Sequence, residues 1–218
     1  MQIGSSGGCV TVVSDRQLVV RRGINLSYLT ILYNSLEAIG SLIAGIMAGS
    51  VTLVGFGADS VIEVTSSVAA QWRLRSDVNE MRRELVEHRT RQIIGWCFAA
   101  LAVYIVLDST HSLWTREEPA KSLFGVVVLV LSVIVMPLLA IAKHRVAQEM
   151  DSRALTADAT QTSLCAYLSV IALAGVALNA FVGWWWADPV AALAMTPIIF
   201  REGFEGIRAK PGADDACC

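Results

Sequence analysis

Long apolar tracts, separated by short charged segments, dominate this chain of 218 residues. A tract running from 23 to 72 is interrupted only by Glu37, Asp59 and Glu63. The tracts that contain no Asp, Glu, Lys or Arg are 92–107, 122–142 and 159–187. A helix needs roughly 20 apolar residues to cross a hydrocarbon core about 30 Å thick, so tracts of this kind predict membrane spans.

The first tract is too long for one span, and Gly49-Ser50 stands where a turn would divide it into two. Asp188-Pro189 predicts the start of a further helix, because proline suits the first helical turn. The pattern therefore predicts an all-α membrane protein, a bundle of six transmembrane helices. The expected spans lie near 24–48, 51–72, 92–113, 122–142, 157–183 and 188–204.

Composition agrees with a chain whose surface faces lipid. Hydrophobic residues make up 55% of the sequence, charged residues 17%, and the mean hydropathy is +0.56. This is more apolar surface than a water-soluble domain of this size can bury, so we expect the lipid bilayer to be a partner. The net charge of -2 gives no indication of a nucleic-acid partner. The sequence has no nucleophile–base pair and no cofactor motif, so we expect neither an enzyme nor a prosthetic group.

The positive charges orient the bundle, because cytoplasmic loops retain Lys and Arg while translocated loops carry few. Fifteen of the 17 Lys and Arg residues fall on one side of the predicted spans, and only Arg116 and Lys121 fall on the other. Both termini are therefore predicted to be cytoplasmic, in what we expect to be a bacterial inner (plasma) membrane. The expected division is a cytoplasmic N-terminal tail over 1–22, a transmembrane domain over 23–205 and a short cytoplasmic C-terminal tail over 206–218.

Charged segments and cysteines add two smaller expectations. The segment 73–91 lacks Pro and Gly and is predicted to extend the second and third helices into the cytoplasm. None of the five cysteines stands in a CxxC pair, so no disulfide is predicted, and Cys97 is expected to be a small buried residue. The terminal Cys217-Cys218 is compatible with capture of a soft metal, with lipidation or with a plain tail, and this stays open.

Two acidic residues at membrane depth are the strongest functional signal, because a carboxylate there costs several kcal/mol. Asp59 and Glu63 stand four residues apart in the second span, so they project from one helix face about 6 Å apart along its axis. Both are placed to reach one cation. The alternative is a helix–helix contact in which one or both carboxyls hydrogen-bond to a neighbouring helix.

A second polar stripe occurs in the fifth span, where Asp158, Gln161 and Cys165 are spaced three and four residues apart. Antiparallel placement of the two helices would level Asp59 with Cys165 and Glu63 with Gln161. A helix-interface role for Gln161 and Cys165 is the alternative here. Glu37 in the first span suits a proton carrier or a helix–helix hydrogen bond equally well.

At these residues the chain resembles the cation diffusion facilitator family of divalent-metal transporters. The segment ADSVIEV at 58–64 is similar to the family motif of two metal ligands four residues apart. The segment ADATQTSLC at 157–165 resembles the family pattern AD-x-x-H-x-x-x-D, with Asp158 as the leading acid and Gln161 and Cys165 at the His and Asp positions. Asn34 and Glu37, Gly49-Ser50 and Asp188-Pro189 also agree, so the resemblance covers residues 24–205.

The departures from the family pattern bear on which metal would bind. Glu63 stands where Asp is usual, and Gln161 and Cys165 replace a His and a carboxylate. A thiolate favours Zn, Cd and other soft ions over Mn or Mg. The chain is thus expected to be a diverged member, and the fourteen residues after Phe204 are too few for the family's cytoplasmic C-terminal domain.

The resemblance implies a secondary transporter in which Asp59, Glu63, Cys165, Gln161 and Asp158 are the candidate ligands of a divalent metal. The metal is expected as substrate, and four ligands of this mix suit tetrahedral Zn. Carboxyl and thiol groups bind metal in their deprotonated forms, so protons are the expected exchange partner, and the resemblance gives outward transport. Homodimerisation is left open. The alternative function is a regulatory or scaffold membrane protein that kept the fold without transport.

Overall fold

The computed structural model describes residues 7–75, 80–150 and 153–208, and side chains over 21–69, 71, 92–150 and 155–208. The described chain consists of six long helices and one short π-helical segment. They are α1 (Gly7–Ala48), α2 (Val51–Arg75), α3 (Glu80–Thr115), α4 (Leu123–Glu149), α5 (Arg153–Ala177), η1 (Leu178–Val182) and α6 (Ala187–Arg208).

The predicted all-α bundle of six helices is confirmed. Five of these helices, α1 to α5, are long and apolar enough to cross a membrane. The sixth, α6, begins at the predicted Asp188-Pro189 but carries Asp188, Arg201 and Glu202 among its apolar residues. The expected extensions of the second and third helices are also confirmed, since α2 continues to Arg75 and α3 begins at Glu80.

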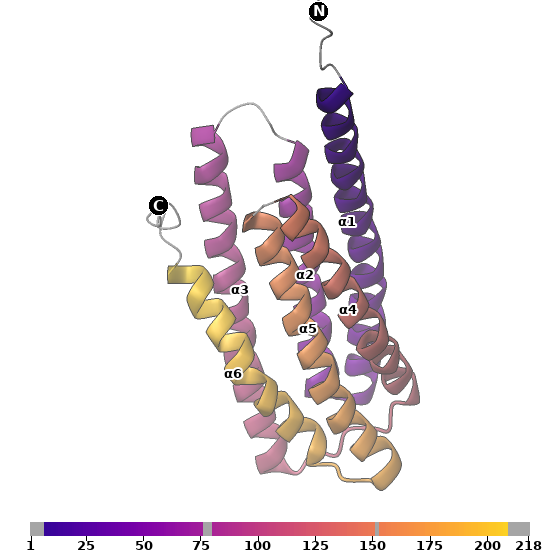
Figure 1. Ribbon diagram of the computed structural model, residues 1–218. Helices are drawn as coiled ribbons and strands as arrows, with labels where there is room; N and C mark the ends of the chain where they lie inside the picture. Colours follow the sequence, from indigo (N-terminus) through magenta and orange to yellow (C-terminus); the bar gives the residue numbers. More distant parts are fainter. Residues whose placement is uncertain (1–6, 76–79, 151–152, 209–218) are drawn as a thin grey trace, which may run out of the picture.

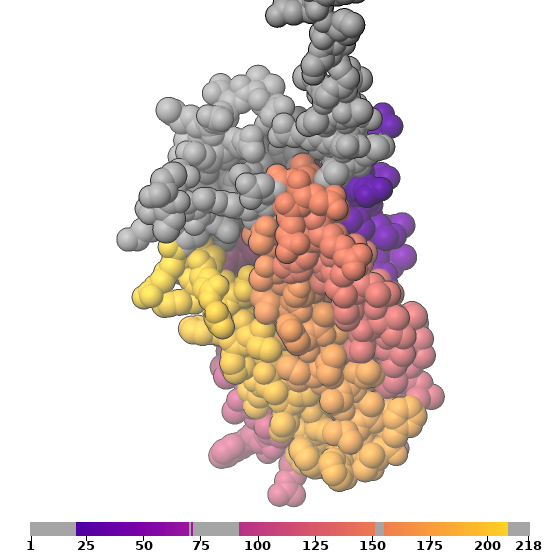
Figure 2. Space-filling view, viewed as in Figure 1, coloured from indigo at the N-terminus to yellow at the C-terminus, as the bar shows by residue number. Residues whose placement is uncertain are grey.

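The helices α2 and α5 form the centre of the bundle. The first packs against α1, α3, α5 and α6, and the second packs against α2, α4 and α6. Around them, α3 lies along α6 and α1 contacts α4 (Figure 1). In Figure 2 the side chains of α4, α5 and α6 form one continuous face of the molecule. The start of α1 and the end of α6 lie toward the end of the bundle where α2 ends and α3 begins (Figure 1).

The turn between α1 and α2 sets the start of the central helix α2. Gly49 has a φ of 63°, a left-handed conformation that glycine adopts without steric cost. The hydroxyl of Ser50 then caps α2 by accepting from the Leu53 N–H at 3.1 Å. The same hydroxyl donates to Asp188 Oδ1 at 2.5 Å, and Thr52 Oγ1 donates to the Asp188 carbonyl at 2.6 Å. The starts of α2 and α6 are thereby joined.

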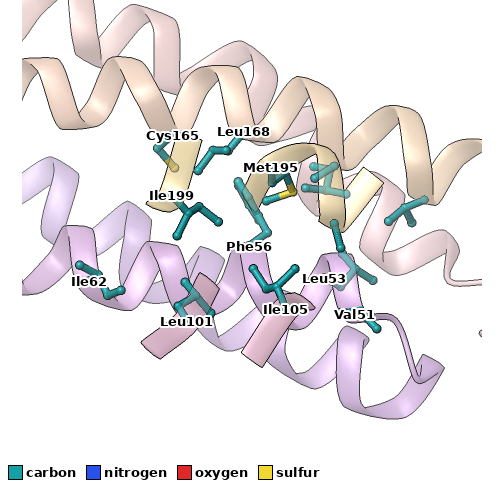
Figure 3. Close-up of a cluster of buried hydrophobic side chains, with 14 of the residues drawn as sticks. Val51, Leu53, Phe56, Ile62, Leu101, Ile105, Cys165, Leu168, Met195 and Ile199 are labelled. Atoms are coloured by element: carbon teal, nitrogen blue, oxygen red, sulfur yellow. The ribbon is translucent and has the colours of Figure 1, made fainter. Parts of the chain in front are cut away.

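An apolar cluster fills the bundle between α2, α3, α5 and α6. In Figure 3, Phe56 of α2, Leu168 of α5 and Met195 and Ile199 of α6 lie against one another. All four are almost fully buried. Phe56 lies about one helical turn before Asp59 on α2, so the cluster adjoins Asp59 on the side toward the start of the helix.

Two expectations about individual segments need correction. The segment expected as an N-terminal tail over 1–22 is helical from Gly7, because α1 continues without a break from the membrane span. Cys97 is exposed rather than buried. It precedes Phe98 on α3, and Phe98 and Leu101 face the core, so Cys97 is turned outward toward the lipid side.

Candidate metal centre

The face of α2 that turns toward α5 carries three polar residues at intervals of four. Asp59, Glu63 and Ser67 have relative exposures of only 4%, 1% and 0%. A four-residue interval keeps side chains on one helix face. The predicted acidic face of the second span therefore lies inside the bundle rather than toward lipid.

The facing side of α5 runs in the opposite direction, and its polar residues pair one by one with those of α2. We call the paired residues of the two faces the ladder. Ser67 donates to Asp158 Oδ1 at 3.0 Å, and Thr162 donates to Glu63 Oε1 at 2.6 Å. On the third rung, the thiol of Cys165 interacts with the carboxyl of Asp59 and also with that of Glu63. The expected level of Asp59 with Cys165 is present. The partner of Glu63 is Thr162, not Gln161 as expected.

Each of the two α2 carboxylates keeps one buried oxygen available for a ligand. Among the described residues, Asp59 Oδ2 and Glu63 Oε2 have no hydrogen-bond partner. A buried carboxylate oxygen without a partner costs free energy, so such an atom indicates a place for a bound cation or water. Gln161 Nε2 is likewise buried and unpartnered within the described part of the chain.

Asp158 is engaged differently from the two acids of α2. Its Oδ2 lies 2.9 Å from the ammonium of Lys143, which reaches in from α4. The ammonium also donates to Thr162 Oγ1 at 2.8 Å and to Ser67 Oγ at 3.3 Å. Lys143 is only 5% exposed. Sequence reasoning had counted this lysine among the charges beyond the fourth span, but α4 continues through it to Glu149.

The candidate metal ligands do not form a complete coordination shell in this structure. Over the described side chains, no group of three His, Cys, Asp and Glu residues stands in position to hold a metal ion. The structure instead places the Asp59 and Glu63 carboxyls near one thiol, with Asp158 held by Lys143. A metal would therefore need these side chains to move in order to gather its ligands.

Glu37 lies close to the same centre from α1. It is 4% exposed, and its Oε2 accepts a hydrogen bond from Ser60 at 2.9 Å. Its other oxygen, Oε1, has no partner among the described residues. The hydrogen bond supports the helix-contact interpretation of Glu37, while the second oxygen leaves the proton-carrier interpretation open.

Sequence reasoning missed Ser67, Thr162 and Lys143. The two hydroxyl residues are hard to recognise because serine and threonine are frequent throughout these helices. For Lys143 a signal exists in the sequence. The buried positions of α4 recur with the helical period, as at Met136, Leu139 and Ala140, and continuing that period places residue 143 on the buried face.

Comparison with known proteins bears on the family to which the chain belongs. Residues 91–210 match the cation efflux transmembrane domain, which is more than half of the 218-residue chain. The chain belongs to the cation efflux family. This cation efflux domain match includes Lys143, Asp158 and Cys165, whereas Asp59 and Glu63 of α2 precede it. The protein is thus a multi-pass integral membrane protein of a family whose members typically move cations and are not enzymes.

A curated relative gives a second comparison. Transmembrane protein 163 of Xenopus laevis is 28% identical over 172 residues, which are 72% of this chain. The aligned part spans 61% of the length of that relative. The relative is a vertebrate protein, so this comparison does not show the expected bacterial membrane.

Proposed function

We propose that the protein is a secondary transporter that moves a divalent metal cation, with Asp59, Glu63 and Cys165 as its principal ligands. The observation that supports this most is that the Asp59 and Glu63 carboxyls, which interact with the Cys165 thiol, each have one buried oxygen without a partner among the described residues. Two carboxylates and a thiolate suit Zn, and Cd or another soft ion would also bind such a set. Gln161 would complete the shell after a side-chain movement, and Asp158 would do so only on separating from Lys143.

The expected exchange partner is the proton. Metal binding requires carboxylate and thiolate ligands to be deprotonated, so each metal that enters must release protons from this buried centre. The outward direction and the bacterial inner membrane remain part of the proposal, whereas homodimerisation is left open.

One observation favours the alternative of a regulatory or scaffold protein without transport. Three metal-ligating side chains do not converge within the described part of the chain, and a lysine lies among the acids. A protein of that kind would bind no metal at Asp59 and Glu63. Metal binding therefore separates the two functions.

Calorimetry of the purified protein in detergent tests the proposal. We expect Zn or Cd to bind to the wild type, and Asp59→Asn or Glu63→Gln to weaken binding at least about tenfold by removing a charged ligand at constant volume. Asp108→Asn is the matched control, because Asp108 on α3 accepts from Tyr104 at 3.0 Å, away from the ladder. Absence of Zn and Cd binding by folded wild-type protein would remove the basis of the transporter proposal.

A further inference from the structure

The ammonium of Lys143 occupies a position at which oxygen atoms from two helices converge. Ser67 and Glu63 contribute from α2, and Asp158 and Thr162 contribute from α5. The distances from Nζ are 2.8 Å to Thr162, 2.9 Å to Asp158, 3.3 Å to Ser67 and 4.0 Å to Glu63. A lysine has three N–H donors, and the three shorter contacts provide one acceptor for each.

The residues around the ammonium also form hydrogen bonds with one another. Ser67 donates to the other oxygen of Asp158 at 3.0 Å, and Thr162 donates to Glu63 at 2.6 Å. These residues are all nearly fully buried, with at most 3% exposure for the four that surround the ammonium. The position is therefore a preformed cation site whose ligands are all oxygen.

We propose that Lys143 is a resident cation that fills an all-oxygen site next to the Asp59, Glu63 and Cys165 centre and so excludes hard divalent cations from it. Mn²⁺ and Mg²⁺ prefer carboxylate and hydroxyl oxygen ligands, whereas soft ions gain from the thiolate. With its carboxylate bound to Lys143, Asp158 is withheld from the substrate metal. The thiol then decides which ions bind. This inference rests on the proposed transport function for its biological meaning.

A purely structural role for Lys143 makes a different prediction. An ion pair that only fastens α4 to α5 would affect stability when it is removed, without changing which metals bind. A resident cation affects selectivity as well, because its removal opens the oxygen site. Metal preference is therefore the measurement that separates the two roles.

The experiment uses four versions of the full chain: wild type, Lys143→Met, Asp158→Asn and the double variant. Binding of Mn²⁺ is followed by the electron paramagnetic resonance signal of the free ion, and binding of Cd²⁺ by calorimetry. We expect Lys143→Met to raise the affinity for Mn²⁺ relative to Cd²⁺ by about tenfold or more. Asp158→Asn alone keeps the ammonium in place and should not admit Mn²⁺. In the double variant the freed site keeps Glu63 but lacks the nearer carboxylate of Asp158, and the ratio should return toward that of the wild type.

Folding is controlled in parallel by gel filtration and thermal unfolding. Removing one partner of a buried ion pair is more destabilising than removing both, so the double variant should unfold at a higher temperature than Lys143→Met. Lys143→Gln, which keeps donors for Thr162 and Asp158, replaces the methionine variant should that variant not fold. Arg201→Met is the matched control, since it breaks an exposed ion pair with Glu205 on α6.

An unchanged ratio of Mn²⁺ to Cd²⁺ affinity in the folded Lys143 variants would overturn the inference. A gain of Mn²⁺ binding on removal of the ammonium would support it, even in a protein whose wild type binds no Cd²⁺. The failure of the resident-cation inference is thus distinguishable from the failure of the proposed transport function.

Discussion

At the scale of single residues, Cys165 is the donor that distinguishes this centre from one made only of oxygen. Its side chain belongs to the apolar cluster that contains Leu168 and Ile199 (Figure 3), and its thiol also interacts with the carboxyls of Asp59 and Glu63. Asp59 and Glu63 are hard oxygen donors that bind many divalent ions. The chemical preference of the centre should therefore depend on the sulfur.

We predict that Cys165→Asp weakens Cd and Zn relative to Co and Mn by roughly tenfold, because a carboxylate binds soft ions less well than a thiolate does. Cys165→Ser should weaken all four metals, since a hydroxyl is a poor replacement for either. The measurement is competitive binding of each metal at one fixed pH, because thiol and carboxyl lose their protons over different pH ranges.

Cys97→Ser is the matched control, as Cys97 is exposed on α3 and lies outside the centre. It should leave the order of metal affinities as it is in the wild type. Equal ratios of Cd to Mn in all versions would mean that Cys165 contacts a helix rather than the ion, and the centre would reduce to Asp59 and Glu63.

Sequence reasoning identified the acids and the thiol but not their partners. The four-residue spacing of Asp59 and Glu63 suffices to place them together, since it holds in any helix. Gln161 and Thr162 lie at about equal angles on either side of the line that joins Asp158 to Cys165 on a helix of 3.6 residues per turn. The rotation of α5 about its own axis, relative to α2, decides which of the two residues contacts Glu63. The spacing of residues in the sequence does not determine this rotation.

At the scale of helices, the contact between α3 and α6 depends on glycines. A Cβ built on Gly95 would lie 2.7 Å from the Ile207 nitrogen and 2.8 Å from the Gly203 carbonyl oxygen. Membrane helices associate largely through close packing, because lipid tails are as apolar as the side chains that they replace. The backbones of α3 and α6 can approach closely here because Gly95 and Gly203 have no side chains to separate them.

We predict that Gly95→Leu lowers the free energy of unfolding by about 1–3 kcal/mol or prevents folding, because the added side chain forces α3 and α6 apart. The measurement is the thermal unfolding midpoint in detergent, followed by circular dichroism. Ala100→Leu on the exposed face of α3 is the matched control and should leave the midpoint nearly unchanged. Equal midpoints for the two variants would show that the α3–α6 contact does not support the fold.

Helix positions were more predictable from sequence than helix ends. Apolar tracts indicate where a chain crosses lipid, and the described spans begin and end within a few residues of those expected for α2 and α3. A helix does not end where its apolar residues end, however. Lys143 belongs to α4 and Gly7 begins α1 for this reason, since charged residues at a membrane surface do not interrupt the backbone hydrogen bonds.

At the scale of the whole molecule, polar and apolar layers follow one another along the central helices. Along α2 the apolar residues Leu53 and Phe56 come first, and Asp59, Glu63 and Ser67 follow them. The hydrogen bonds of Asp188 join the start of α2 to the start of α6. Under the proposed function, alternating access requires these contacts at the starts of α2 and α6 to open while contacts at the opposite end of the bundle close.

Flux of metal and protons in reconstituted vesicles tests the central claim most directly. Proteoliposomes carrying a pH-sensitive dye inside are given Zn, Cd, Co, Mn or Fe outside, and internal metal is measured together with internal pH. We predict that wild-type protein admits Zn and Cd most readily and that the interior becomes more alkaline, because protons leave in exchange for the metal. Asp59→Asn should abolish both signals, and Asp108→Asn should preserve them. Vesicles with folded wild-type protein that take up no more metal than protein-free vesicles would contradict the account.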